Sequence, residues 1–319
     1  MRKIHETVHV GVDIHSRLVM PPMVTEASVG GEISEKTLAY YKKMAANKQF
    51  DLFIIEHSYV SEDGKASLKQ MSLADDKKIA GHGKLVEVIK SVRPHAAVFL
   101  QLNHAGIKTR ADIIGANPMG PSVRPWDKMC RAMSLEDMAR VKEDFVAAGL
   151  RAKAAGYDGA ELHVAHGYLL NQFLSPLTNF RDDDYGEDRV KYPLEVFRAM
   201  KEALGDFPLA VRIGGIETIE GGTTVDDGVR AAKAFDTAGA AFLDMTGGMT
   251  GYNRPGHEEA GWFQDLSRAV KGETTAPVLL TGGITTYDEA EKLLAEDAAD
   301  LFGIGRAFLK DPNWETDKL

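Results

Sequence analysis

Eight short apolar runs follow one another along the chain, at residues 18–20, 52–55, 97–102, 159–164, 209–213, 242–245, 277–281 and 301–304. The runs are continuously apolar rather than alternating with polar residues. This pattern is typical of parallel strands that are covered on both faces. We therefore expect eight parallel strands, each followed by a segment that returns the chain to the same edge of the sheet.

The segments between the runs have apolar residues at helical spacing, as in helices with one buried face. Five of them lie at residues 34–47, 74–91, 190–204, 225–238 and 287–295. A longer one begins at Ser134, has Asp137 three residues later as in a capping box, and stops before Gly156. Alternating strands and helices predict an α/β fold, a (β/α)8 TIM barrel that forms a single domain over residues 1–319. A doubly wound sheet is the alternative, but it usually has fewer strands.

The spacing between the predicted strands indicates where the functional site lies. The longest connections follow the third and fourth strands, at residues 104–133 and 165–189. In a barrel of this type, the loops after the strands form the catalytic face. Long loops in compact domains are commonly lids or binding loops. We expect these two loops to contribute to a site on that face.

Composition excludes several classes of function. The chain of 319 residues has 47 acidic and 38 basic side chains, a net charge of −9, which argues against nucleic acid as a partner. A single cysteine, Cys130, excludes an internal disulfide and a four-cysteine iron–sulfur cluster. No apolar stretch reaches the roughly 18 residues that cross a bilayer. The first ten residues lack the apolar core of a signal peptide. We expect a cytoplasmic protein without a membrane partner.

Two histidines and a tyrosine follow the fourth predicted strand, in the segment ELHVAHGY at residues 161–168. His163 and His166 are three residues apart, so both cannot point to one side of an extended strand, and His166 must lie past the strand end. Both rings can then converge with Tyr168 over the barrel mouth, as two hydrogen-bond donors and a proton source. Glu161 with the histidines could suggest zinc, but the spacing matches no zinc motif, and we expect no metal.

Polar side chains also occur inside two other predicted strands. Arg212 interrupts an apolar run and needs a partner when buried, either a carboxylate on a neighbouring strand or an anionic ligand at the barrel mouth. Gln101 near the end of the third strand could bind the edge of a flat heterocycle or make a contact within the barrel. Position alone leaves both pairs of alternatives open.

Glycine pairs mark the ends of the last two strands. Gly282 and Gly283 follow the seventh strand, and Gly303 and Gly305 follow the eighth, with Arg306 next to them. Glycines here free backbone N–H groups at helix starts, which is the usual phosphate site of such a barrel. The pattern predicts a phosphorylated ligand. The three tryptophans, Trp126, Trp262 and Trp314, are predicted to be packing residues.

Six segments together form a specific pattern: RLVMPPM at 17–23, QLNHAG at 101–106, GPS at 120–122, ELHVAHGY at 161–168, FLSPLTNFR at 173–181 and GIGR at 303–306. In this order they resemble the old yellow enzyme family of FMN-dependent NAD(P)H oxidoreductases. The resemblance runs over nearly the whole chain. Members of this family have a (β/α)8 barrel, and many reduce the C=C bond of α,β-unsaturated carbonyl compounds.

The resemblance implies which residues bind FMN. In its pattern Gln101 would bond the pyrimidine edge, and Arg212 would face the N1/C2=O end, where the reduced flavin is anionic. The expected FMN-binding residues are Pro21, Pro22, Met23, Val24, His57, Gln101, Arg212, Gly282, Gly283, Gly305 and Arg306.

The resemblance also implies a reaction. NADH or NADPH would reduce FMN, and hydride would then pass to an enone-type substrate. His163 and His166 would hold the substrate oxygen, and Tyr168 would protonate the carbon next to the carbonyl group. Alternatives are flavin-dependent dehydrogenation or demethylation of amines or saturated carbonyl compounds, a barrel aldolase or lyase acting on a phosphorylated substrate, and an FMN-binding protein without activity. No lysine at the predicted strand ends supports a Schiff-base aldolase. Association into a homo-oligomer stays open.

Three positions differ from the family's common pattern. Val24 stands where bacterial relatives often have Cys, and His57 stands where a small residue is common. Glu26 replaces a Tyr that often binds substrate, so Glu26 is expected either to bind substrate or to point to solvent. These changes bear on substrate choice and on the tuning of the flavin.

Overall fold

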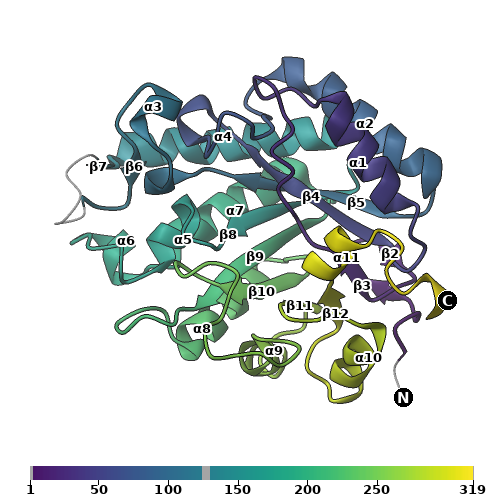
Figure 1. Cartoon of the computed structure of the whole chain (residues 1–319). Coiled ribbons are helices and arrows are strands. Elements are labelled where there is room, and N and C mark those ends of the chain that lie inside the picture. Colours follow the sequence, from purple (N-terminus) through teal and green to yellow (C-terminus); the bar gives the residue numbers. More distant parts are fainter. Residues whose placement is uncertain (1–2, 124–129, 319) are drawn as a thin grey trace.

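Eight parallel strands close into a barrel in the computed structural model, which describes residues 3–123 and 130–318 (Figure 1). Around the barrel the order is β10, β11, β12, β3, β4, β5, β8 and β9. The strands are β3 (Leu18–Met20), β4 (Leu52–Tyr59), β5 (Ala97–Asn103), β8 (Gly159–Val164), β9 (Leu209–Ile216), β10 (Leu243–Gly247), β11 (Val278–Thr281) and β12 (Leu301–Gly303). Each overlaps one of the eight apolar runs, so the predicted single-domain TIM barrel is confirmed.

Helices surround the barrel on its outside (Figure 1). They are α1 (Glu35–Ala45), α2 (Ile79–Val92), α4 (Leu135–Ala154), α7 (Lys191–Leu204), α8 (Val225–Thr237), α9 (Gln264–Lys271), α10 (Tyr287–Ala295) and α11 (Arg306–Lys310). The capping box predicted for α4 is present: the Ser134 side chain accepts from the Asp137 N–H, and the Asp137 side chain accepts from the Ser134 N–H. None of the helices in the described ranges is both long and apolar enough to span a membrane.

The two long loops contain short elements of their own. Residues 104–123 and 130–133 include α3 (Ala111–Ile114), β6 (Met119–Gly120) and β7 (Arg131–Ala132). Residues 165–189 include α5 (Leu169–Leu174) and α6 (Asp184–Glu187). Trp126, expected to be a packing residue, lies outside the described residues.

An N-terminal hairpin was not predicted from the sequence. Its strands, β1 (Val8–His9) and β2 (Asp13–Ile14), pair in antiparallel fashion. Val10 and Ile14 of the hairpin belong to one apolar cluster with residues from inside the barrel, among them Leu52 and Phe99. The hairpin therefore closes the end of the barrel at which the strands begin.

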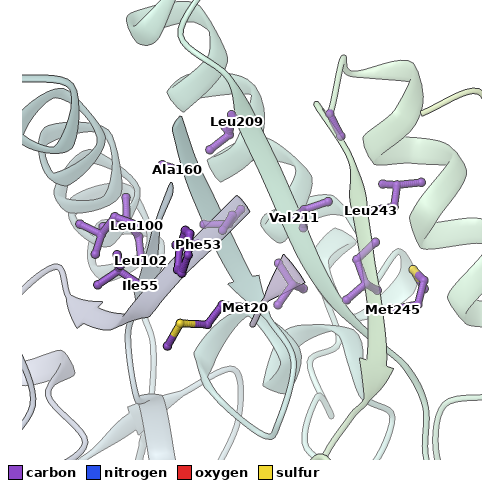
Figure 2. Packing of buried hydrophobic residues seen from close by; sticks show 14 of the residues in the cluster. Met20, Phe53, Ile55, Leu100, Leu102, Ala160, Leu209, Val211, Leu243 and Met245 are labelled. Carbon is purple, nitrogen blue, oxygen red and sulfur yellow. The ribbon is translucent and has the colours of Figure 1, made fainter. Parts of the chain in front are cut away.

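The strands divide the core into two clusters. Along β4, Leu52 and Ile54 belong to the cluster inside the barrel, whereas Phe53 and Ile55 belong to the larger cluster under the helices. Figure 2 shows side chains of the larger cluster on neighbouring strands, including Leu100, Val211 and Met245. Because side chains alternate along a strand, the inward positions nearer the strand ends remain available for polar residues.

Candidate active site

The C-terminal ends of the barrel strands surround a cavity of about 560 Å³. Pockets for small molecules and cofactors are typically ~300–1,000 Å³. The predicted site residues that line this cavity are Pro21, Pro22, Met23, Val24, His57, Gln101, His163, His166, Tyr168, Arg212, Gly282, Gly283, Gly305 and Arg306. Residues distributed over almost the whole sequence thus meet in one place, on the face where barrel enzymes bind their substrates.

The two histidines lie at different levels, as their spacing requires. His163 is on β8, and His166 lies just past the strand end with a left-handed backbone (φ 59°). The two rings are 5.1 Å apart between centroids, and the Tyr168 ring is 5.0 Å from that of His163. The turn at His166 therefore brings both imidazoles and the phenol together at the cavity.

Burial sets the protonation of this cluster. It lowers the pKa of His163 and of His166 well below the ordinary value of 6.5, so both rings are neutral at pH 7. His166 Nε2 lies 3.1 Å from Thr246 Oγ1, whereas His163 Nδ1 is buried without a hydrogen-bond partner in the described part of the chain. Burial also raises the pKa of Tyr168 to about 12, so the phenol keeps its proton.

Arg212 meets a carboxylate on the neighbouring strand. Its Nε lies 3.1 Å from Oδ2 of Asp244 on β10, and both side chains are almost completely buried. The contact is an ion pair by distance, but its angles do not make a hydrogen bond, so Arg212 Nε and both Asp244 oxygens lack hydrogen-bond partners among the described residues. Arg212 also lines the cavity. The structure thus shows the carboxylate partner on a neighbouring strand, whereas the anionic ligand stays a prediction for the side of Arg212 that lines the cavity.

The side chain of Gln101 is hydrogen-bonded to a carboxylate on the neighbouring strand. Its Nε2 donates to Glu161 Oε1 at 2.7 Å, which leaves its carbonyl oxygen for the cavity. Burial raises the pKa of Glu161, the nearby charge of Asp244 raises it further, and Arg212 opposes both effects. Gln101, Glu161, Arg212 and Asp244 form a buried polar layer inside the barrel, and Arg212 pairs in register with His163 of β8.

The glycine-rich end of the cavity has little room for side chains. A Cβ atom at Gly283 would lie 2.4 Å from Trp262 Nε1, and one at Gly303 would lie 2.0 Å from Thr281 Oγ1. The Arg306 guanidinium stands over the Trp262 ring, 4.7 Å from its centroid. Trp262 packs against the core, as predicted, and its indole also lines the cavity beside Gly282 and Gly283.

Glu26 is the predicted site residue that does not line the cavity. It is exposed in the loop after β3 and has a left-handed backbone (φ 48°). The same loop is held from inside by Glu56, whose carboxylate accepts hydrogen bonds from the N–H and the hydroxyl of Thr25. The placement of Glu26 agrees with its solvent-facing alternative.

Several lining residues were missed by the sequence analysis. Lys108 extends from the loop after β5, Thr246 belongs to β10, and Tyr252 lies in the loop that follows β10. The residues around them form no recognisable motif. An isolated lysine or tyrosine in a loop is ordinarily a surface residue, so the sequence alone does not place it at a site.

The cavity fits FMN better than a metal. Buried polar atoms of His163, Arg212 and Thr281 have no hydrogen-bond partner among the described residues, these three residues line the cavity, and closely packed glycines form its narrow end. Such atoms are costly unless a ligand satisfies them. Within residues 3–123 and 130–318, no three histidine, cysteine or acidic side chains are grouped to hold a metal ion.

Comparisons with known proteins identify the family of the chain. The sequence pattern of the NADH:flavin oxidoreductase / NADH oxidase family matches residues 6–318. An NADPH dehydrogenase from Halalkalibacterium halodurans is 34% identical over 312 residues, which cover 95% of this chain and 90% of that protein. An NADH oxidase from Thermoanaerobacter brockii is 38% identical over 315 residues, but this chain spans only 48% of its length.

Solved structures have the same fold. A 2-naphthoyl-CoA reductase bound to 2-naphthoyl-CoA superposes with a TM-score of 0.88 over 97% of this chain and 51% of that chain, at 23% identity. The old yellow enzyme homologue from Zymomonas mobilis superposes with a TM-score of 0.84 over 98% of this chain and 91% of its own, also at 23% identity. Because the family pattern and a relative of similar length both match almost end to end, the chain belongs to the NADH:flavin oxidoreductase family of oxidoreductases, the old yellow enzyme family.

Proposed function

We propose that the protein is an FMN-dependent NAD(P)H oxidoreductase that reduces the C=C bond of α,β-unsaturated carbonyl compounds. One observation carries this proposal: two neutral imidazoles and a protonated phenol converge at a cavity whose other end has the features of a phosphate site. A Schiff-base aldolase is disfavoured, because Lys108 is the lysine among the described lining residues and it lies in a loop after β5.

The proposed FMN-binding residues form two groups, one for the phosphate and one for the flavin ring. Gly282, Gly283, Gly305 and Arg306 would hold the FMN phosphate, and the carbonyl oxygen of Gln101 would accept from the flavin's pyrimidine edge. Arg212 would face the flavin's N1/C2=O end, where a cation stabilises the anionic reduced form. Bound FMN would supply hydride transfer from NADH or NADPH to the substrate.

His163 and His166 would bind the substrate carbonyl oxygen. Neutral imidazoles can donate hydrogen bonds there without holding a formal charge, and they stabilise the negative charge that grows on this oxygen. Thr246 contacts Nε2 of His166 and so fixes the orientation of that ring. The unpartnered Nδ1 of His163 is a second polar atom that a ligand would satisfy.

Tyr168 would deliver a proton to the substrate carbon next to the carbonyl group. Its pKa of about 12 keeps it in the acid form at neutral pH. A general acid in position contributes typically 10²–10⁴-fold to the rate.

The test is an anaerobic two-step titration of the purified protein. We expect a yellow protein that is bleached by NADH or NADPH and regains its colour when cyclohex-2-enone is added. A protein that is bleached but regains colour only with oxygen would contradict the enone reductase. Steady reduction of the flavin by an amine or a saturated ketone would instead support the dehydrogenase alternative.

A further inference from the structure

Lys108 lies at the end of the cavity that is lined by His163 and His166, called here the imidazole end. Lys108 ends the short helical turn Gly106–Lys108, and its Nζ donates to the carbonyl oxygen of His166 and lies 4.5 Å from the Tyr168 ring centroid. The residue as a whole is exposed at the cavity mouth, but its ammonium group is packed against these buried neighbours, and burial lowers its pKa. Lys108 makes no ion pair with any described residue.

The charges around the cavity show which cation lacks an assigned role. Its basic lining residues are Lys108, Arg212 and Arg306, and the acidic residue that the described lining contains is Glu258. Arg212 is paired with Asp244, and Arg306 stands at the glycine-rich end, beside Trp262. Lys108 therefore leaves the imidazole end with an uncompensated positive charge.

His57 adds a hydrogen-bond donor whose proton can be located from its neighbours. The Ala66 N–H donates to Gln70 Oε1 at 2.7 Å, so the amide nitrogen of Gln70 is the atom that faces His57. This nitrogen lies 2.6 Å from His57 Nδ1, which must accept, and a neutral ring then carries its proton on Nε2. Burial, with the charge of Lys108, lowers the pKa of His57 to about 4, so the ring is neutral at pH 7.

The His57 ring and the Lys108 ammonium group lie beside the same tyrosine, Tyr168. His57 lines the cavity, its Nδ1 edge is turned to Gln70, and its ring is 5.2 Å from that of Tyr168. Nε2 makes no hydrogen bond to the described residues. The phenol that would protonate the substrate thus has an ammonium group on one side and an N–H donor close by.

We propose that Lys108 and the Nε2–H of His57 form an anion subsite beside Tyr168, and that this subsite selects unsaturated carbonyl substrates which also carry a carboxylate. The inference rests on the proposed function, because the substrate must occupy the cavity beside Tyr168. The carbonyl oxygen binds to His163 and His166, and the carboxylate binds to the subsite. The same anion chemistry occurs in the phosphates of NADH and NADPH, so the test must separate these two sources.

The experiment measures binding without turnover. Cyclohexanone and 3-oxocyclohexane-1-carboxylate have no C=C bond to reduce, and they differ by one carboxylate. Their dissociation constants for the flavin-loaded protein are measured by calorimetry in the parent, in Lys108→Met and in His57→Phe. Lys108→Arg keeps the charge. Lys43→Met is the matched control, since Lys43 is exposed in the last turn of α1, at the opposite end of the barrel.

We expect the parent to bind the carboxylated ketone at least about tenfold tighter than cyclohexanone, because charge-assisted hydrogen bonds are worth ~1.5–3 kcal/mol. Lys108→Met should reduce this ratio by about tenfold and His57→Phe by about threefold. Lys108→Arg and Lys43→Met should keep it. Selectively ¹⁵N-labelled histidine should show His57 as the neutral Nε2–H tautomer.

Three results would overturn the subsite. One is a parent ratio near one, and another is a ratio that Lys108→Met leaves unchanged. The third is a Lys108→Met variant that loses affinity for NAD⁺ and NADP⁺ but not for the carboxylated ketone, which would assign the cation to the nicotinamide nucleotide. In each case a protein that is still bleached by NAD(P)H and reoxidised by cyclohex-2-enone retains the proposed function, so the two failures are distinguishable.

Discussion

The two halves of the barrel interior are built on the same strands but have opposite chemistry. Near the strand starts, the inward side chains are apolar and pack against the N-terminal hairpin, with Phe99 and Phe242 5.7 Å apart between ring centroids. One inward position further along, β5 has Gln101, β8 has Glu161, β9 has Arg212 and β10 has Asp244. All four side chains are buried.

The two halves differ in how many of their buried polar atoms have hydrogen-bond partners. The lower half, near the strand starts, is packed with apolar side chains that need no partner from outside the chain. The upper half is the part of the interior nearer the strand ends. In the upper half, buried atoms of Glu161, His163, Arg212 and Asp244 have no hydrogen-bond partner among the described residues. Buried polar groups without partners destabilise a fold, so a ligand that supplies partners would stabilise this half. The lower half is thus a structural core, and the upper half is the proposed binding site inside the same core.

Arg212→Met should have the largest effect. Removing one partner of a buried ion pair costs roughly 3–5 kcal/mol of unfolding free energy, because Asp244 and Glu161 would face each other without a cation. The variant should also bind FMN more weakly and lower the reduction potential of any flavin that remains. Denaturant unfolding without flavin and a potentiometric titration with it measure the two effects. An unchanged potential in a folded variant would place Arg212 away from the flavin.

Phe99→Ala tests the lower half, because Phe99 belongs to the apolar cluster inside the barrel. Truncating a fully buried phenylalanine costs roughly 3–5 kcal/mol of unfolding free energy. The flavin's dissociation constant and potential should stay as in the parent, because the change lies below the polar layer. If Phe99→Ala shifts the potential as far as Arg212→Met does, the two halves are not independent.

Tyr168→Phe should separate the two half-reactions. The phenol is the proposed proton donor to carbon, which only substrate reduction needs, so that step should slow by roughly 10²–10⁴-fold. Flavin reduction by NADPH needs no proton at carbon and should change little. Stopped-flow measurements of each half-reaction give the answer. Equal slowing of both would make Tyr168 a structural or access-controlling residue.

Glu161→Gln should change the pH dependence of stability. The folded protein raises the pKa of Glu161 above the ordinary value of 4.5, so protonation favours the folded state. Its contribution is therefore fully present below about pH 4.5 and is lost as pH rises through the raised value, by at most about 1.4 kcal/mol per pH unit. Unfolding of the flavin-free parent and variant from pH 5 to pH 8 should show the parent losing stability relative to Glu161→Gln.

Glu26→Gln should have the smallest effect on stability and activity, because Glu26 is exposed and does not line the cavity. An exposed side chain away from special contacts usually changes stability by less than about 0.5 kcal/mol. The pH profile of enone reduction and the preference between neutral and charged substrates should match the parent. A changed profile would return Glu26 to the substrate site.

Most of the fold could be predicted, because each barrel strand is a continuous apolar run and each long helix has a periodic apolar face. The N-terminal hairpin could not, because strands of two residues are too short to show a period. β4 runs four residues beyond its predicted end, through Tyr59, with an irregular register after Ile55 that places polar Glu56 and His57 within the strand.

The site was predictable where family motifs or strand ends marked it. The positions of Lys108 and Trp262 at the cavity were not predicted, because they depend on how the loops after β5 and β10 fold, which no local pattern encodes. A carboxylate on a neighbouring strand was one of two alternatives for the Arg212 partner, but the register that selects Asp244 is a property of the closed barrel.

The identity of the bound flavin is the decisive measurement for the proposed cofactor site. The purified protein is denatured, and the released cofactor is separated by chromatography and compared with FMN and FAD standards. We expect FMN, about one per chain, because the ends of the last two strands of this one barrel form the proposed phosphate site. Recovery of FAD, or a colourless protein that also fails to bind added FMN, would contradict it.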